Sequence, residues 1–178
     1  YRFTMKIVCT IEARMTSKRL PGKVLLNAAN KPFLQHLIER IKSVNCIDEI
    51  VLATTINKVD LQLVELAKKL DISFFQGSEN NVMQRVIGAA NFSKADCIVE
   101  ITGDCPIIDP SIIEHSIVTF KANKVDYLAN NHIQSYPDGM DVQIISKDIL
   151  IDSYGRVKTD LEKEHVTLHI RRNPDLYK

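Results

Sequence analysis

The sequence predicts an α/β fold, in which a mostly parallel sheet is covered by helices on both faces. Segments of strand length, rich in apolar and β-branched residues, alternate four times with segments whose apolar residues recur at helical spacing. The length of 178 residues, with 45% hydrophobic content, is enough for one domain with its own core. Such alternation implies right-handed crossovers, so we expect a three-layer, Rossmann-like α/β/α arrangement.

The expected elements begin with a buried strand at 7–11, followed by a basic loop that Pro21-Gly22 punctuates. Further strands are expected at 49–55, 72–75 and 96–102, and helices at 32–45, 58–70, 110–123 and after an N-cap at Ser78. The pattern changes after Val125, with expected strands at 126–128 and 140–145, a turn at 135–139, and helices near 147–154 and 160–172. Such an interruption commonly carries either a second substrate's site or a subunit contact, as in a homodimer, and both alternatives stay open.

Composition and charge exclude several classes of protein. The net charge is +1, so no overall field attracts nucleic acid or a membrane surface, and no apolar run is long enough to cross a bilayer. The four cysteines have no metal-binding spacing, and we expect free, mostly buried thiols in a reducing cytoplasm. Residues 1–4 precede Met5 and are expected to be foreign to the native protein, which leaves residues 5–178 as a single domain.

The loop after the first strand concentrates positive charge. From residue 13 to residue 38 there is no Asp or Glu, and the cations in this range are Arg14, Lys18, Arg19, Lys23 and Lys31. Guanidinium groups and exposed backbone N–H groups suit phosphate oxygens, and the loop leaves a strand's carboxyl end, where open α/β sheets bind ligands. A solvated basic loop is the alternative. Val24 follows Gly22-Lys23, so this is no P-loop, and no G-x-G-x-x-G occurs in the chain.

Residues 13–23, which read A-R-x-x-S-x-R-L-P-G-K, resemble the nucleotide-binding signature of sugar-acid cytidylyltransferases. The likeness is closest to the spore-coat polysaccharide (SpsF-type) branch, related to 3-deoxy-manno-octulosonate and acylneuraminate cytidylyltransferases. In that family the loop wraps the triphosphate of CTP, and the fold is that of the nucleotide-diphospho-sugar transferases, which is glycosyltransferase-A-like. The resemblance implies catalytic roles for Arg14 and Lys23, and nucleotide contacts for Ile11, Ala13, Arg14, Ser17, Arg19 and Lys23.

The segment Gly103-Asp104-Cys105-Pro106 follows the strand expected at 96–102. A carboxylate at a strand's carboxyl end, preceded by glycine, is suited to Mg²⁺ that bridges nucleotide phosphates, although a turn residue or helix cap is the alternative. In the family, G-D-x-P supplies the metal aspartate, so the resemblance implies that Asp104 is the Mg²⁺ ligand and catalytic, with Gly103 beside the nucleotide. Asp109 is expected to cap a helix. The family's second metal aspartate lies in a D-x-P-E-D segment that residues 173–178 do not match, so we expect CTP binding with slow turnover.

Three further segments add candidate contacts. Residues 77–85 resemble the family's G-S-E-x-x-V-x-x-R, residues 136–141 are close to its Y-P-D-G-L-D, and residues 164–167 match its E-H-V-T. The resemblance implies base or ribose contacts for Ser78, Asn81 and Arg85, and sugar contacts for Asp138, Asp141, Glu164, His165 and Arg172. Thr54 ends a strand at the same edge and is a further nucleotide candidate. Strand ends, a turn and capped helices explain the same residues without a ligand.

The predicted function is therefore transfer of CMP from CTP to a sugar acid of the 3-deoxy-manno-octulosonate or nonulosonate kind, for surface polysaccharide synthesis. Pyrophosphate would leave as a sugar hydroxyl attacks the α-phosphorus, with the loop cations and Mg²⁺ at Asp104 stabilising the phosphate charge. Two alternatives stay open. A nucleotide-sugar-dependent glycosyltransferase would usually carry D-x-D, which the sequence lacks, and a non-catalytic nucleotide-binding or assembly domain would need no complete metal site.

Overall fold

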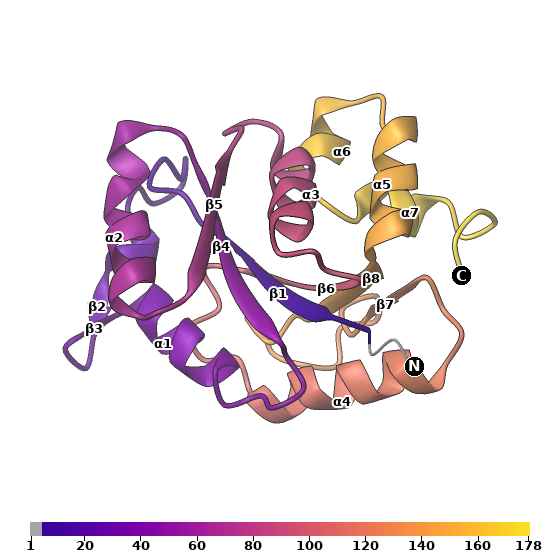
Figure 1. The fold of residues 1–178 in the computed structure, drawn as a ribbon, viewed down its shortest axis with the longest axis horizontal. Helices are drawn as coiled ribbons and strands as arrows, with labels where there is room; N and C mark the ends of the chain where they lie inside the picture. The colour runs from indigo at the N-terminus through magenta and orange to yellow at the C-terminus, as the bar shows by residue number, and fades with distance from the viewer. Residues whose placement is uncertain (1–4) are drawn as a thin grey trace.

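The structure, a computed structural model, describes residues 5–178, and a six-stranded sheet lies at its centre (Figure 1). The strands are β1 (Ile7–Glu12), β4 (Glu49–Thr55), β5 (Ser73–Gly77), β6 (Cys97–Thr102), β7 (Tyr127–Ala129) and β8 (Gln143–Ser146). Their order is β5-β4-β1-β6-β8-β7; the first four are parallel, and β8 is antiparallel to both β6 and β7. The predicted mostly parallel sheet is confirmed. The expectation for residues 1–4 lies outside the described residues.

Helices cover both faces of the sheet, as Figure 1 shows. They are α1 (Phe33–Ile41), α2 (Leu61–Lys69), α3 (Val82–Phe92), α4 (Pro110–Ala122), α5 (Lys147–Arg156), α6 (Asp160–Glu164) and α7 (Leu168–Arg172). Apolar residues of α1, α2 and α4 form one buried cluster with Ile7, Cys9 and Ile11, whereas α3, α5 and α7 form a second with Val8. Alternate residues of β1 thus enter opposite layers, which is the predicted three-layer arrangement.

The sheet order places a topological switch point between β1 and β6. After β1 the chain adds β4 and β5 on one side and then returns to add β6 on the other side of β1. Parallel crossovers of this kind leave a crevice where neighbouring connections diverge, at the carboxyl ends of the two strands. In the pairing register Glu12 lies opposite Thr102 there. The fold therefore brings the ends of these two strands together.

Several predicted boundaries were wrong. The helix expected at 160–172 is two short helices, because residues 165–167 leave helical geometry and Val166 and Thr167 become buried. The helix expected after Ser78 begins at Val82, because the Asn81 side chain accepts the capping hydrogen bond from the Gln84 N–H at 2.9 Å. The expected cap at Asp109 is confirmed, since its side chain accepts from the Ser111 N–H at 2.8 Å.

Short elements between β1 and α2 were not predicted. They are the 3₁₀ helices η1 (Lys23–Leu25) and η2 (Lys58–Asp60) and the two-stranded ribbon of β2 (Asn27–Ala28) and β3 (Lys31–Pro32). Such pieces are too short for periodicity to reveal. All four cysteines are free thiols in the described chain. Within residues 5–178, no helix has the length and apolarity needed to cross a membrane.

Candidate active site

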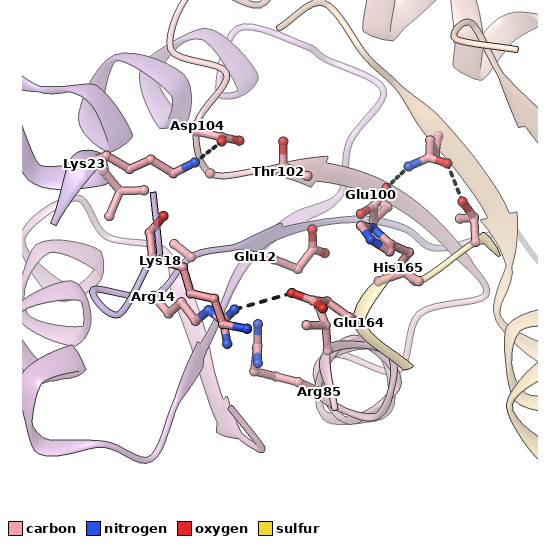
Figure 2. A pocket seen from close by; sticks show the side chains of 18 of the residues that line it. Glu12, Arg14, Lys18, Lys23, Arg85, Glu100, Thr102, Asp104, Glu164 and His165 are labelled. Atoms are coloured by element: carbon pink, nitrogen blue, oxygen red, sulfur yellow. Dashed lines mark hydrogen bonds and ion pairs between the residues drawn. The ribbon is translucent and has the colours of Figure 1, made fainter. Parts of the chain in front are cut away.

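A cavity of about 450 Å³ opens at the carboxyl ends of β1 and β6, at the switch point. One wall is the basic loop, which we define as residues 13–23; the opposite wall comes from α3 and the segment from α6 to α7. Figure 2 shows the labelled side chains turned toward this space. The site residues predicted from sequence that line it are Ala13, Arg14, Ser17, Arg19, Lys23, Arg85, Gly103, Asp104, Glu164 and His165.

A buried carboxylate holds the basic loop. Asp60 is fully buried, and its Oδ1 accepts a 2.7 Å hydrogen bond from the Met15 N–H while Oδ2 accepts from the Thr55 hydroxyl. The Met15 carbonyl in turn accepts from the Gly22 N–H at 2.8 Å, and Gly22 has the left-handed φ of 72° that glycine adopts freely. Asp60 and Gly22 therefore fix both ends of the loop.

Glu79 links the same loop to the ends of β4 and β5. Its carboxylate accepts from the Thr16 hydroxyl and from Asn57 Nδ2, the latter at 2.7 Å, and these hydrogen bonds lower the pKa of Glu79. Arg14 Nη1 donates to the Glu79 carbonyl at 3.0 Å, and Arg14 Nη2 lies 3.6 Å from Glu164 Oε1. Arg14 thus bridges the loop and α6, with its charge facing the cavity.

Lys23 and Asp104 face each other across the mouth of the cavity and form an ion pair (Figure 2). Burial alone raises the pKa of Asp104, but hydrogen bonds from Lys23 and Thr102 outweigh that effect and hold the pKa below its ordinary value. Asp104 is therefore ionised at neutral pH. The Lys23 ammonium occupies the place beside the carboxylate where another cation would bind.

Gly103 has a packing reason to be glycine. A Cβ there would lie 2.8 Å from the Glu12 carbonyl oxygen and 2.9 Å from Ala13 Cβ. The Gly103 N–H donates to that same carbonyl at 2.9 Å. A larger residue would push the end of β6 away from the end of β1, so Gly103 keeps the two cavity walls in register.

The donor set fits Mg²⁺ only as an ion shared with phosphates. Among residues 5–178, no group of three or more His, Cys, Asp or Glu side chains converges as a metal site. Asp104 supplies one ionised carboxylate at the cavity edge. Magnesium commonly uses one or two protein carboxylates and takes its other ligands from water and substrate phosphates. The Asp104 carboxylate suits that mode.

Two carboxyl groups that sequence reasoning missed form the cavity floor. Glu12 ends β1, Glu100 lies in β6, and each side chain projects from the sheet face that carries α3. Burial, and then the negative charge of Glu100, raise the pKa of Glu12 well above 4.5; burial also raises the pKa of Glu100. The two groups are within hydrogen-bonding reach of each other, so one proton between them relieves the repulsion.

A hydrogen-bonded network fixes Glu100. Its Oε2 accepts from Gln143 Nε2, and Gln143 Oε1 accepts from the Tyr127 hydroxyl at 2.7 Å and from the Thr167 hydroxyl at 2.5 Å. The two hydroxyl donors hold the Gln143 amide with its NH₂ group toward the carboxylate. Three separate segments, β7, β8 and the link to α7, thereby support one carboxyl group.

Arg85 is a buried cation in the same wall. Its Nε donates to the Ala53 carbonyl at 3.1 Å, and its Nη1 donates to the Ser78 carbonyl and, at 3.4 Å, to the Glu79 carbonyl. Burial lowers the pKa of Arg85, and the charge of Glu12 opposes this. An arginine stays protonated despite such a shift. Arg85 therefore ties β4 to the turn before α3 and also brings a positive charge to the cavity.

The structure places the other predicted site residues elsewhere. The predicted residues outside the lining are Ile11, Thr54, Ser78, Asn81, Asp138, Asp141 and Arg172. Ile11 and Thr54 are buried in the sheet, and Asn81 caps α3 and donates to the Tyr154 hydroxyl at 3.0 Å. Of the two arginines at the end of α7, Arg171 lines the cavity and Arg172, the expected contact, does not.

The lining residues that were not predicted include Glu12, Glu100, Thr102, Gln143 and Thr167, and Lys18 lines the cavity as one of the loop cations. The sequence did contain one signal for the floor. Thr10 and Glu12 alternate in β1, and Glu100 and Thr102 alternate in β6, within otherwise apolar strands. Polar residues at period two on a covered face of a sheet indicate a ligand or a polar network.

Comparison with known proteins gives consistent matches. A family model described as cytidylyltransferase matches residues 8–178. An uncharacterised protein of Methanocaldococcus jannaschii is 37% identical over 174 residues, covering 98% of this chain and 70% of that protein. The spore coat polysaccharide biosynthesis protein SpsF of Bacillus subtilis is 33% identical over 177 residues, covering 97% and 72%. A 3-deoxy-manno-octulosonate cytidylyltransferase of Geobacter metallireducens is 30% identical over 119 residues, covering 67% and 46%.

Solved structures confirm the predicted fold class. A cytidylyltransferase from Leptospira borgpetersenii superposes with a TM-score of 0.94 at 33% identity, covering 98% of this chain and 74% of that one. The CMP:2-keto-3-deoxy-manno-octonic acid synthetase complexed with CTP superposes with a TM-score of 0.71 at 19% identity, covering 96% and 86%. The second likeness shows a shared nucleotidyltransferase-type fold and no more.

Proposed function

Because the chain belongs to the cytidylyltransferase family, as its motifs predicted, we propose that it transfers CMP from CTP to a sugar acid and releases pyrophosphate. Family membership makes it a nucleotidyltransferase, which disfavours both a glycosyltransferase and a non-catalytic nucleotide-binding domain. One observation carries the proposal. The basic loop and the ionised Asp104 lie side by side at the edge of a cavity at the switch point, which suits a triphosphate and its metal ion.

The basic loop is the proposed triphosphate site. Arg14, Arg19 and Lys23 line the cavity and offer charge-assisted hydrogen bonds to phosphate oxygens, with Ser17 adding a hydroxyl. Asp60 and Gly22 hold the loop in one shape before the substrate arrives. Positioned cations lower the barrier because they stabilise charge that moves onto the leaving pyrophosphate.

Asp104 is the proposed ligand for Mg²⁺. When bound, the ion would neutralise phosphate charge and orient the α-phosphorus for in-line attack. Lys23 must then leave Asp104, and the freed ammonium is placed to contact a phosphate oxygen. In the reaction, an acceptor hydroxyl oxygen forms a bond to the α-phosphorus as the bond to the bridging oxygen breaks, and the hydroxyl proton is lost to solvent or a base.

The acceptor would enter from the side of α6 and α7. Glu164, His165 and Arg171 line that side, and the matching relatives include a 3-deoxy-manno-octulosonate cytidylyltransferase and a spore coat polysaccharide protein. These names support a sugar acid of that general class and a role in surface polysaccharide synthesis. The cytoplasmic location and the homodimer stay predictions.

The test is pyrophosphate release with CTP and Mg²⁺ over a panel of sugar acids that includes 3-deoxy-manno-octulosonate and N-acetylneuraminate. We expect release with at least one acid, with CTP preferred over UTP and ATP. If the protein binds CTP but releases no pyrophosphate with each acid of the panel in turn, the proposed acceptor class is contradicted.

A further inference from the structure

The Glu12 and Glu100 pair at the cavity floor has hydrogen-bonding capacity that the protein itself does not use. Glu12 Oε2 is buried, and apart from the proton that it can share with Glu100, no donor among residues 5–178 reaches it. Among the described residues, the side-chain donor to Glu12 Oε1 is the Thr10 hydroxyl, through a long bond of 3.4 Å. A buried acceptor left without a donor is destabilising, and proteins usually fill such positions.

The pair is built rather than accidental. The Gln143 amide, itself held by the Tyr127 and Thr167 hydroxyls, donates to Glu100 Oε2 and leaves Glu100 Oε1 toward Glu12 and the cavity. Two positive groups face the pair from neighbouring elements, Arg85 from α3 and Arg171 from α7. Arg85 donates its hydrogen bonds to backbone carbonyls, so it moderates the negative charge without filling the acceptor positions.

The position of the pair separates it from the phosphate site. In Figure 2, Glu100 lies on the side of the cavity away from Lys23 and Asp104, and Glu12 lies between them. The carboxyl pair would repel phosphate oxygens, whereas the basic loop attracts them. The side chains that hold Glu100 in place come from β7, β8 and the link to α7. The basic loop and Asp104 instead follow two of the four parallel strands.

We propose that the Glu12 and Glu100 pair is the binding site for the acceptor's hydrogen-bond donors, its hydroxyl or amino groups, and that it turns any acceptor carboxylate away from the cavity floor. This inference rests on the proposed function, because it takes the second substrate to be the acceptor of CMP. The pair accepts donors through Glu100 Oε1 directly, and through the buried Glu12 Oε2 when the Glu12 carboxylate turns toward the cavity. It repels a carboxylate, which is directed instead toward Arg171 and the basic loop. The acceptor therefore carries donors on the face opposite its acid group.

A set of isosteric variants tests the proposal. In Glu12→Gln the new amide donates toward Glu100, and Glu100 carries the single negative charge of the pair. In Glu100→Gln the new amide donates toward Glu12, and Glu12 carries that charge. Only the double variant, E12Q/E100Q, removes the charge. The three probes are 3-deoxy-manno-octulosonate, mannose and mannosamine, titrated by ligand-observed NMR with CMP and Mg²⁺ present so that no transfer occurs. Glu65→Gln, on the exposed face of α2, is the matched control.

We expect wild type to bind at least one probe, and each single variant and the control to bind it within about threefold of wild type. The double variant should bind about tenfold more weakly, because charge-assisted hydrogen bonds become neutral ones. CTP affinity, measured by calorimetry, should be equal in wild type, the two single variants and the control, and equal or slightly higher in the double variant, which removes one negative charge from the cavity. The double variant should fold, since it removes a buried charge.

Three outcomes would overturn the inference: equal probe binding by wild type and the double variant, a fall in CTP affinity in the double variant, or binding of none of the probes by wild type. The second outcome would assign the pair to the nucleotide. The titrations read binding alone, so they are independent of pyrophosphate release. A failed transfer assay with this binding pattern intact would reject the proposed function and keep the donor-binding site.

Discussion

The Lys23 ammonium is paired with the Asp104 carboxylate across the mouth of the cavity, so the free protein neutralises two charges that the nucleotide complex would use separately. Both side chains are partly exposed, 24% for Lys23 and 39% for Asp104. A pair of this kind contributes only about 0–1 kcal/mol, because water screens it. An incoming triphosphate with its metal ion can therefore replace the pair at small cost.

This arrangement predicts that Asp104→Asn has opposite effects with and without Mg²⁺. Without the metal, the variant should bind CTP up to about fivefold more tightly, because Lys23 is released and a negative charge is removed from the phosphate site. With Mg²⁺, the gain in affinity that wild type shows should be lost, since an amide is a poor ligand for a hard cation. Calorimetric CTP titrations with EDTA or Mg²⁺ measure both effects.

Asp109→Asn is the control for Asp104, because Asp109 caps α4 outside the cavity and asparagine caps equally well. It should leave both affinities unchanged. A full Mg²⁺ response in Asp104→Asn would place the metal elsewhere.

Arg19→Ala should weaken CTP binding by roughly tenfold to a hundredfold, the effect of losing a charge-assisted contact to phosphate. Arg19 lies in the exposed part of the basic loop, so the thermal midpoint without ligand should not change. Lys68→Ala, near the C-terminal end of α2 and outside the cavity lining, removes one exposed positive charge and serves as the control. Equal CTP affinity in wild type and Arg19→Ala would contradict the phosphate role of the loop.

Asp60→Ala should destabilise the protein by about 1–3 kcal/mol and weaken CTP binding, because the part-buried Met15 N–H and the buried Thr55 hydroxyl lose their partner. Asp60→Asn should retain most of both properties, since its amide can accept from Met15 and donate to Thr55 Oγ1. Urea unfolding and CTP titration measure the two effects. If Asp60→Ala is destabilised but binds CTP like wild type, Asp60 supports the fold without shaping the loop.

The Glu12 and Glu100 pair predicts a pH-dependent stability. Burial, and for Glu12 the charge of Glu100, raise the pKa values of the two groups above 4.5, so the folded protein keeps protons that the unfolded chain has lost. The free energy of unfolding should therefore fall as pH rises above about 4.5, until the raised folded-state pKa values are passed.

The double variant E12Q/E100Q lacks these protons. Its stability relative to wild type should increase from pH 4.5 upward, and the difference between the two proteins should become constant below that pH. Urea unfolding at a series of pH values gives the difference. A constant difference across the series would show that the pair does not hold an extra proton.

Periodicity alone located the core of the fold. The four parallel strands and their helices were predictable because apolar alternation and helical spacing follow directly from burial on two faces. The helix expected at 160–172 failed because nothing local marks the break at His165. Val166 and Thr167 leave the helix to be buried against α3 and the cavity floor, which is a tertiary effect.

The candidate site was predictable where a motif is contiguous. The motif of the basic loop and the motif that contains Asp104 each occupy one short, continuous stretch of sequence, and the structure brings the two together. The Glu12 and Glu100 pair depends on strand order and register, with Thr10 opposite Glu100 and Glu12 opposite Thr102, and no local pattern encodes that pairing. Asp60 and Gln143 act through partners that are distant in sequence, for the same reason.

The central claim is that CTP binds with its triphosphate between the basic loop and Asp104. Backbone amide NMR of the ¹⁵N-labelled protein, titrated with CTP and Mg²⁺, tests it most directly. The claim predicts that the largest shifts fall on residues 14–23 and 102–105, and that Arg19→Ala reduces them at equal CTP concentration. Shifts concentrated elsewhere, for example around the second cavity near Asp48 and Ser73, would contradict it.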